Sequence, residues 1–345
     1  MIKKVVLVMT MVLFLGGAAL AEDEEKFSVH ALMDKVSISG DIEVEASLSD
    51  RDEDWEDSDS SDADLATADL AVDVEIHEWA AGHVVFSWDC EDDNNVGIDE
   101  ADITLGGTEA LPLYLKAGRL YVPFGNFETH MISDPLTLEI GEIRNGAVQI
   151  GADISGFYCS AYAFNGEVDE DGEDDDIRCF GSNAGYAFEN DSMSLDVGMG
   201  YVSNLLESGA GDLLEGDLRD YVGGISAHAI AGFGPFAIIT EYVGALDEIE
   251  NTEGWKRDEP SAWNMEFGFT FEAAEKEITL AMAYQGTDEC AGFLPETRIL
   301  GSASVGLADG LGLALEYAHD EDYDESDGGT DEDKNTLTLQ LALEF

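Results

Sequence analysis

A strict alternation of apolar and polar side chains runs from Val36 to Leu48. Apolar residues or glycine occupy the even positions, and serine, aspartate or glutamate the odd ones. Successive side chains of a β-strand point to opposite faces, so such a strand has one apolar and one acidic face. Acidic side chains at every second position could not face a packed core, but they fit a water-filled lumen with the apolar face turned to lipid. The pattern favours a transmembrane β-barrel.

The same period recurs in about sixteen runs, each near the ~10-residue length that a tilted membrane-spanning strand needs. Strands of a soluble β-sandwich would also alternate, but the last run ends the chain on Phe345, which resembles the terminal signal that outer-membrane barrels present to their assembly machinery. The predicted fold class is therefore all-β, an antiparallel up-and-down transmembrane barrel. The runs are 36–48, 66–76, 84–88, 101–105, 113–122, 147–154, 157–164, 180–188, 193–201, 221–229, 236–243, 263–271, 278–284, 299–307, 311–317 and 337–345.

Short and long connections alternate between these runs. Tight turns such as 153–156 and 232–235 are followed by long, mostly acidic segments such as 203–217 and 320–334. Outer-membrane barrels have short periplasmic turns and long extracellular loops, whereas a soluble sandwich has no reason to separate its connections so strictly. We expect the long acidic loops to lie outside the cell.

The first 21 residues predict a secretory signal peptide. Lys3 and Lys4 precede an apolar stretch over residues 5–15, and residues 19–21 match a small-residue cleavage site. An uncleaved anchoring helix is the alternative, but the apolar stretch is short for a span, and no later segment reaches the ~20 consecutive apolar residues of a membrane helix. The expected divisions are a signal peptide (1–21), a short periplasmic segment (22–35) and a barrel in the outer membrane of a Gram-negative bacterium (36–345).

The chain is strongly acidic, with 76 Asp and Glu against 15 Lys and Arg and a net charge of −61, or −63 once Lys3 and Lys4 are lost. This charge disfavours binding to nucleic acid or to an anionic membrane surface. A saline habitat would also favour an acidic surface, and composition does not separate that explanation from attraction of cations. The acids expected to line the lumen are Glu43, Glu45, Asp69, Asp73 and Glu75.

The sequence carries no motif that predicts an enzyme. His77 and His83 are spaced too widely for a zinc-protease helix, which needs two histidines one turn apart. The run 169–172 resembles a calcium loop, yet Arg178 stands where a bidentate glutamate is required, so weak calcium binding by acidic loops is the most that it predicts and no other cofactor is expected.

Four cysteines lie at scattered spacings, which argues against a structural zinc site. Cys159 and Cys179 flank one predicted hairpin loop. In an oxidising compartment they would either form a disulfide or remain as thiols.

The most informative loop lies between the fifth and sixth runs, over residues 123–145. It is less acidic and more apolar than the other long loops. In porins a long loop can fold into the lumen and set the size and the electric field of the pore. An ordinary surface loop is the alternative.

Four segments of this region resemble the siderophore porins of the legiobactin-receptor (LbtU) type and, more distantly, the phosphate-selective porins. The resemblance is densest over 38–166 and rests on Gly118 to Glu128, Ser133 to Glu142, Asp99 to Gly106, and Phe164 to Gly166. It implies a plugless barrel that admits iron–siderophore complexes for iron uptake. An excess of acid is unusual for a pore that passes anionic chelates.

Three functions are consistent with the sequence: a porin for a small solute such as an iron–siderophore complex, a general cation-preferring porin, and a structural or calcium-binding outer-membrane protein. Besides the solute, the expected partners are the outer-membrane lipid bilayer, the barrel assembly machinery and further copies of the chain in a homotrimer. The residues expected at the constriction are Arg119, Glu128, Asp134, Glu139, Glu142 and Arg144. Opposed charges there would orient a polar solute by its dipole.

Overall fold

The computed structural model describes residues 35–51, 58–89, 95–168 and 177–345. The predicted signal peptide, nearly all of the predicted periplasmic segment, Cys90 and the calcium-like run 169–172 lie outside the described residues.

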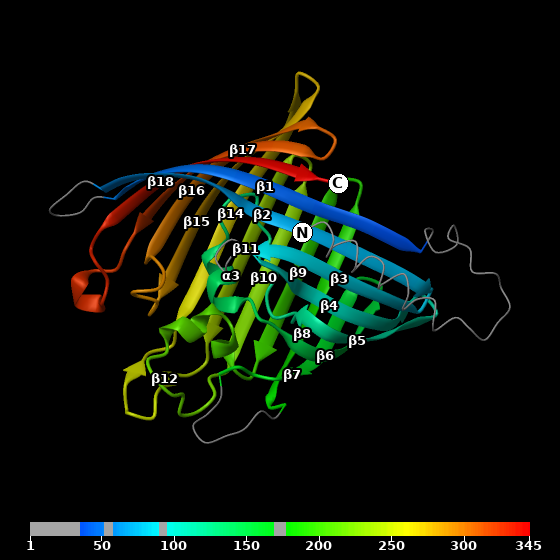
Figure 1. The fold of residues 1–345 in the computed structure, drawn as a ribbon, viewed down its shortest axis with the longest axis horizontal. Helices are drawn as coiled ribbons and strands as arrows, with labels where there is room; N and C mark the ends of the chain where they lie inside the picture. The colour runs from blue at the N-terminus through cyan, green and yellow to red at the C-terminus, as the bar shows by residue number, and fades with distance from the viewer. Residues whose placement is uncertain (1–34, 52–57, 90–94, 169–176) are drawn as a thin grey trace.

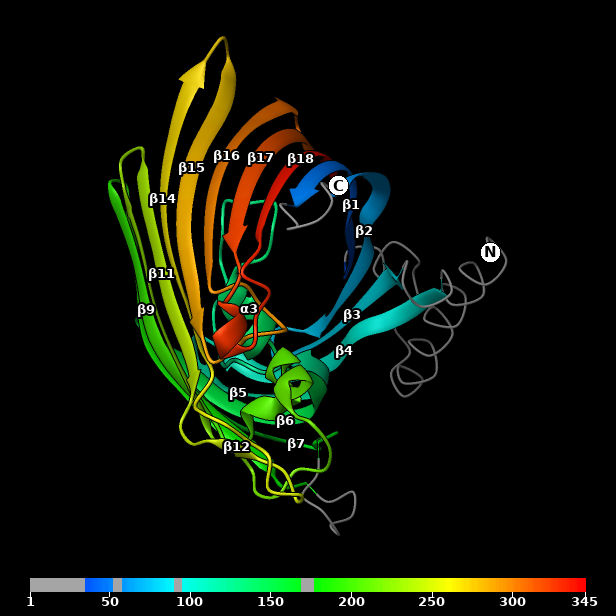
Figure 2. The ribbon, with the colours of Figure 1, turned by 90° about the vertical axis from the view of Figure 1, so that its left-hand side faces the viewer.

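Sixteen antiparallel strands form one closed barrel, which confirms the predicted fold class (Figures 1 and 2). Each predicted run corresponds to one strand, because apolar and polar residues alternate in every one of these runs. The barrel strands are β1 (Val36–Arg51), β2 (Ser58–His77), β3 (Ala80–Asp89), β4 (Asn95–Thr108), β5 (Leu111–Tyr121), β6 (Arg144–Ile154), β7 (Phe157–Phe164), β8 (Cys179–Asn190), β9 (Met193–Val202), β10 (Gly224–Phe233), β11 (Phe236–Ala245), β14 (Ser261–Ala273), β15 (Lys276–Asp288), β16 (Thr297–Ala308), β17 (Leu311–Glu321) and β18 (Asp333–Glu344).

The first and last strands close the barrel. β1 pairs with β18 over eleven positions, from Asp41 opposite Glu344 to Arg51 opposite Lys334. The last residue extends this seam, because Gly40 and Phe345 exchange two backbone hydrogen bonds of 3.0 Å. Closure removes both sheet edges, which a barrel in a bilayer requires because lipid offers no partner for backbone groups.

The two faces of the wall differ as the alternation predicts. On β18, Leu337, Leu339, Leu341 and Leu343 are exposed on the outer surface. Inward positions on other strands carry carboxylates that are almost completely buried, such as Glu266 and Glu316, each 1% exposed. The barrel therefore has an apolar exterior and an interior rich in charged groups that are held by protein contacts.

A charge placed on the apolar exterior should destabilise the barrel. Leu339 faces outward between Ala46 of β1 and Leu315 of β17. We expect Leu339→Arg to lower the free energy of unfolding by about 2–4 kcal/mol, the typical cost of arginine near the bilayer midplane. The matched control is Gln340→Arg, because the amide of Gln340 donates to Glu45 inside the barrel at 2.9 Å. Urea unfolding in lipid vesicles measures both; equal losses for the two variants would contradict the assignment of faces.

The long connections carry structure that the sequence did not predict. Side chains from these loops and from strands β5 to β9, β11 and β14 form one buried apolar cluster, which includes Leu136, Leu205, Leu218, Ile249 and Leu294. The loops therefore have a core of their own at one end of the barrel. Their elements are α3 (Leu136–Gly141), the 3-10 turns η1 (Leu205–Glu207), η2 (Gly209–Leu213) and η3 (Glu325–Asp327), and a hairpin of β12 (Ile249–Glu250) and β13 (Lys256–Arg257). Within the described residues, no helix is both long and apolar enough to cross a bilayer.

The disulfide considered between Cys159 and Cys179 does not form. Cys159 lies opposite Ala184 in the β7–β8 pair, whereas Cys179 lies opposite Phe164. Five residues of strand therefore separate the two thiols, or about 17 Å at the usual rise per residue, and a disulfide needs Cα atoms within about 7 Å. Cys179 is instead buried with its Sγ atom 3.9 Å from Oε1 of Glu207.

Candidate functional site

The connection between β5 and β6 folds inside the barrel. Its backbone amides donate to inward-facing side chains of the far wall: Asn126 to Glu241 of β11 at 2.7 Å, His130 to Glu266 of β14 at 2.8 Å, and Ile132 to Glu316 of β17 at 2.6 Å. In Figure 2 its helix, α3, lies within the ring of strands. We call residues 122–143 the inner loop.

Apolar packing fixes α3 against the wall. Leu136, Thr137 and Ile140 are buried, and the helix lies against β11, β14 and β15. The amide of Leu136 at the helix start donates to Oε1 of Gln285 at 3.2 Å. The apolar residues that distinguish the inner loop in the sequence are therefore those that attach it to the barrel.

Three acids of the inner loop form an electrostatically linked group. Burial raises the pKa of the Asp134 carboxyl, and nearby Glu316 raises it further while Arg298 opposes the shift. Burial and then Asp134 raise the pKa of Glu139. Burial and the charges of Asp134, Asp99 and Glu139 together raise the pKa of Glu142 to about 7, against the opposing charge of Arg144.

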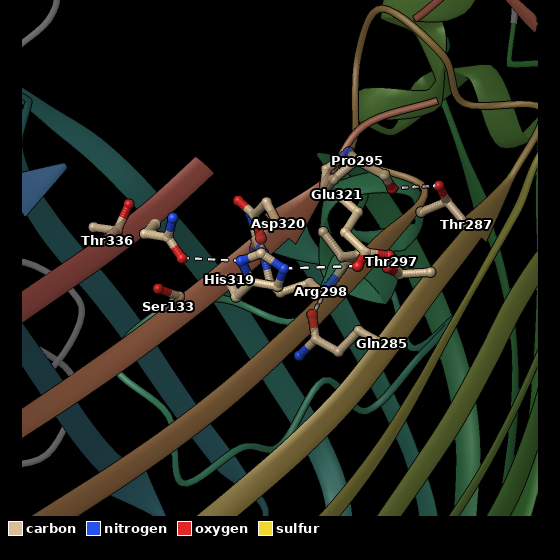
Figure 3. Close-up of polar contacts among 12 residues, drawn as sticks. Ser133, Gln285, Thr287, Pro295, Thr297, Arg298, His319, Asp320, Glu321 and Thr336 are labelled. Carbon is tan, nitrogen blue, oxygen red and sulfur yellow. Dashed lines mark hydrogen bonds and ion pairs between the residues drawn. The ribbon is translucent and has the colours of Figure 1, made fainter. Parts of the chain in front are cut away.

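The basic residues near this group are already paired with wall acids. Arg298 of β16 holds Asp320 of β17 through two bonds, Nε to Oδ1 at 2.7 Å and Nη2 to Oδ2 at 3.2 Å. Figure 3 draws this part of the wall, with Arg298 beside Asp320 and with Ser133 of the inner loop nearby. Arg144 forms an ion pair with Asp99 of β4. These pairs leave most of the carboxylate charge of the inner loop uncompensated.

A cavity of about 830 Å³ lies between the inner loop and the β1–β4 side of the wall. Among the described residues that line it, none is lysine or arginine, and seven carry carboxyl groups. These are Asp41, Glu43, Asp69, Asp99, Glu100, Glu142 and Glu344. Most of these carboxyl groups lie on the barrel wall, where Arg144 pairs with Asp99, and Glu142 is contributed by the inner loop.

The structure brings together most of the residues predicted for the constriction. Asp134, Glu139, Glu142 and Arg144 lie within electrostatic reach of one another, and Glu128 is exposed on the same loop near His130. Arg119 lies apart from them. It shares the face of β5 that carries Leu113 and Leu115, its side chain is exposed, and the adjacent Leu120 takes the buried inward position.

The five acids predicted to line the lumen occupy one face of β1 and β2. Glu43 and Asp69 border the cavity. Oε1 of Glu45 accepts from Gln340, and Oδ1 of Asp73 lies 2.6 Å from Nδ1 of His83. Glu75 follows Asp73 by two residues and is exposed near the short-turn end of β2.

Sequence reasoning missed the wall residues that hold the inner loop. Glu266 lies between Met265 and Phe267, and Glu316 between Leu315 and Tyr317, at positions of ordinary period-two alternation. Nothing in that alternation distinguishes them from other inward polar residues of the same strands. His130 was also missed: its hydrogen bond to Glu266 raises the pKa of the imidazole, and burial only partly offsets this. No group of three metal-binding side chains occurs within the described ranges.

A closed sixteen-stranded barrel with a long loop packed inside it has the architecture of outer-membrane porins. Three solved structures share this fold over 90% of the chain: an anion-selective porin from Comamonas acidovorans (TM-score 0.62, 11% identity, 99% of that chain), the outer membrane channel DcaP of Acinetobacter baumannii (0.61, 13%, 97%), and a trimer form of OmpT from Vibrio cholerae (0.52, 11%, 99%). The chain thus has the sixteen-stranded barrel fold of these outer-membrane porins.

The chain also matches curated relatives in the genera Coxiella and Legionella. The chain is 27% identical over 265 residues to a UPF0422 protein of Coxiella burnetii, which covers 72% of this chain and 57% of the relative. It is 26% identical over 250 residues to UPF0422 protein lpg2959 of Legionella pneumophila, covering 64% and 46%. The chain therefore spans about half the length of the curated relatives it matches. No protein-family model matches it.

Proposed function

We propose that this protein is an outer-membrane diffusion channel that prefers cations. The observation that carries the proposal is the cavity beside the inner loop, which is lined by seven carboxyl groups and, within the described part of the chain, by no basic residue. Rings of acidic side chains select cations in channels, because fixed negative charge concentrates cations and repels anions. An anion-selective porin shares the fold, so the charge of the lining, and not the barrel, decides the preference.

Reversal potentials test this proposal. The protein is reconstituted in a planar bilayer with a tenfold gradient of potassium chloride. We expect a reversal potential of the sign and size of a cation-preferring channel, with a smaller value at high salt, because screening shortens the reach of the fixed charges. A potential of the opposite sign contradicts the proposal.

Passage of an iron–siderophore complex is a second candidate. The segment from Ser133 to Glu142 resembles the siderophore porins, and this resemblance supports the candidate. The same segment contains the three linked acids of the inner loop. The acidic lining adds a condition: the chelate should be neutral or positively charged overall. Block of potassium current by a cationic ferric chelate, compared with the same chelator without iron, tests this candidate. Equal currents with and without every chelate tested would contradict it.

Export and assembly complete the proposal. We propose that residues 1–21 direct the chain across the inner membrane as a signal peptide that is then cleaved after Ala21. We also propose that three copies assemble, as in the structural neighbour described as a trimer form. Mass spectrometry of the purified protein gives the mature N-terminus, and its native mass in detergent gives the number of copies.

A further inference from the structure

Residues 126–133 of the inner loop run across the inner surface of the barrel wall; we call them the anchor segment. At intervals of three residues, the segment donates hydrogen bonds to a carboxylate on a different strand. The amides of Asn126 and Phe127 donate to Glu241 at 2.7 and 3.0 Å. The hydroxyl of Thr129 and the amide of His130 donate to Glu266 at 2.7 and 2.8 Å.

The third contact lies at the end of the anchor segment. The amides of Ile132 and Ser133 donate to Oε2 of Glu316 at 2.6 and 3.3 Å, and the Ser133 hydroxyl donates to Oε1 at 2.5 Å. Asp134, the first of the three linked acids, follows directly. Glu316 thus joins the wall to the point where the anchor segment becomes the charged part of the loop.

The three carboxylates depend on the loop for their hydrogen bonds. Glu241, Glu266 and Glu316 are 4%, 1% and 1% exposed. All the hydrogen bonds that the described residues make to these carboxyl groups come from the inner loop, including one from Thr137 to Glu241 at 3.1 Å. By contrast, the wall acids Glu43 and Glu45 accept from Thr67 and Gln340 of neighbouring strands. A buried carboxylate without donors is strongly disfavoured, so the loop and these acids hold each other in place.

We propose that Glu241, Glu266 and Glu316 are positioning residues of the channel. They act by fixing the anchor segment, which holds Asp134, Glu139 and Glu142 at a set distance from the β1–β4 wall. This inference rests on the proposed channel function and deepens it, because it names the groups that keep the charged loop still. Functional groups are held most accurately when rigid elements support them, and here three separate strands do so. Glu316 has the greatest influence, because it binds Ser133, the residue directly before Asp134.

Single-channel recording of Glu316→Gln tests the positioning role. Glutamine keeps the size of the side chain but removes its negative charge, so the bonds from Ile132 and Ser133 lose the added strength of a charged acceptor. We expect at least a threefold increase in open-channel current noise, with frequent steps to lower conductance. A merely structural role would change the yield of folded barrel and leave the current noise of folded channels unchanged.

The matched control is Glu277→Gln. Glu277 is an exposed carboxylate at the short-turn end of β15, so this variant removes the same charge without touching the inner loop, and its noise should equal that of the unmodified protein. Folding of each variant is checked by the shift of the unheated band in gel electrophoresis. Noise unchanged in folded Glu316→Gln overturns the inference.

A second variant decides the outcome if Glu316→Gln does not fold. Ser133→Ala removes the hydroxyl bond from the loop side and leaves the wall intact, and we expect a smaller rise in noise, about 1.5- to 2-fold. A Ser133→Ala channel whose current noise equals that of the unmodified protein then overturns the inference. Failure of the proposed function is seen separately, because anion preference appears in the reversal potential of the unmodified channel and does not alter the noise comparison.

Discussion

The combined substitution Asp134→Asn, Glu139→Gln and Glu142→Gln is expected to lower the cation-over-anion permeability ratio by about tenfold. Two unit charges about 4 Å apart in water interact by about 1 kcal/mol, which corresponds to about a fivefold change in an equilibrium. Three fully charged groups would therefore give a larger effect. The pKa of Glu142, raised to about 7, means that this group is only partly ionised near neutral pH, which reduces the expected change to about one order of magnitude.

Reversal potentials in a tenfold salt gradient at neutral pH measure this effect. The matched control replaces three exposed acids at the short-turn ends of the barrel, Glu189→Gln, Glu272→Gln and Glu277→Gln. It removes the same formal charge where bulk water screens it, so its permeability ratio should change by less than about twofold. Equal effects of the two triple variants would mean that the inner loop is not the selective part of the channel.

The fold could be predicted almost completely from the sequence, because its physical cause is local. A barrel strand between lipid and water must alternate apolar and polar side chains. Each strand can therefore be recognised from its own residues alone. The sixteen predicted runs lie on the sixteen strands, although observed strands such as β2 extend well beyond the predicted run into the acidic loop sequence. Residues 58–64 are serines and aspartates with a single alanine, so they show no apolar alternation that would mark them as strand, and the predicted run began too late.

The candidate site could be predicted only in part. The loop acids were proposed because their run is unlike the other loops, but the wall acids that bind the loop lie more than 100 residues further along the chain. Arg119 shows a different limit. A shift of one residue reverses the face of a strand, and only the structure shows that Leu120 and not Arg119 points inward.

The pH dependence of selectivity should reveal Glu142 directly. The carboxyl of Glu142 has its pKa raised to about 7, so it is mostly protonated at pH 6 and mostly charged at pH 8. A raised pKa on an acid means that negative charge is gained as the pH rises through that value. We therefore expect the cation-over-anion permeability ratio to increase by about threefold to fivefold between pH 6 and pH 8, the effect of about one added charge beside the ion path.

Two variants separate Glu142 from the other titrating groups. Glu142→Gln should remove most of the increase, whereas Asp322→Asn should keep it. Although burial opposes this, hydrogen bonds from Thr330 and Tyr323 lower the pKa of Asp322, so that loop carboxylate stays ionised throughout the range. His130 contributes in the same direction, because its raised pKa means that a positive charge is lost as the pH rises. Adding His130→Gln to Glu142→Gln removes that contribution, and a full pH response in the double variant would show that neither group controls it.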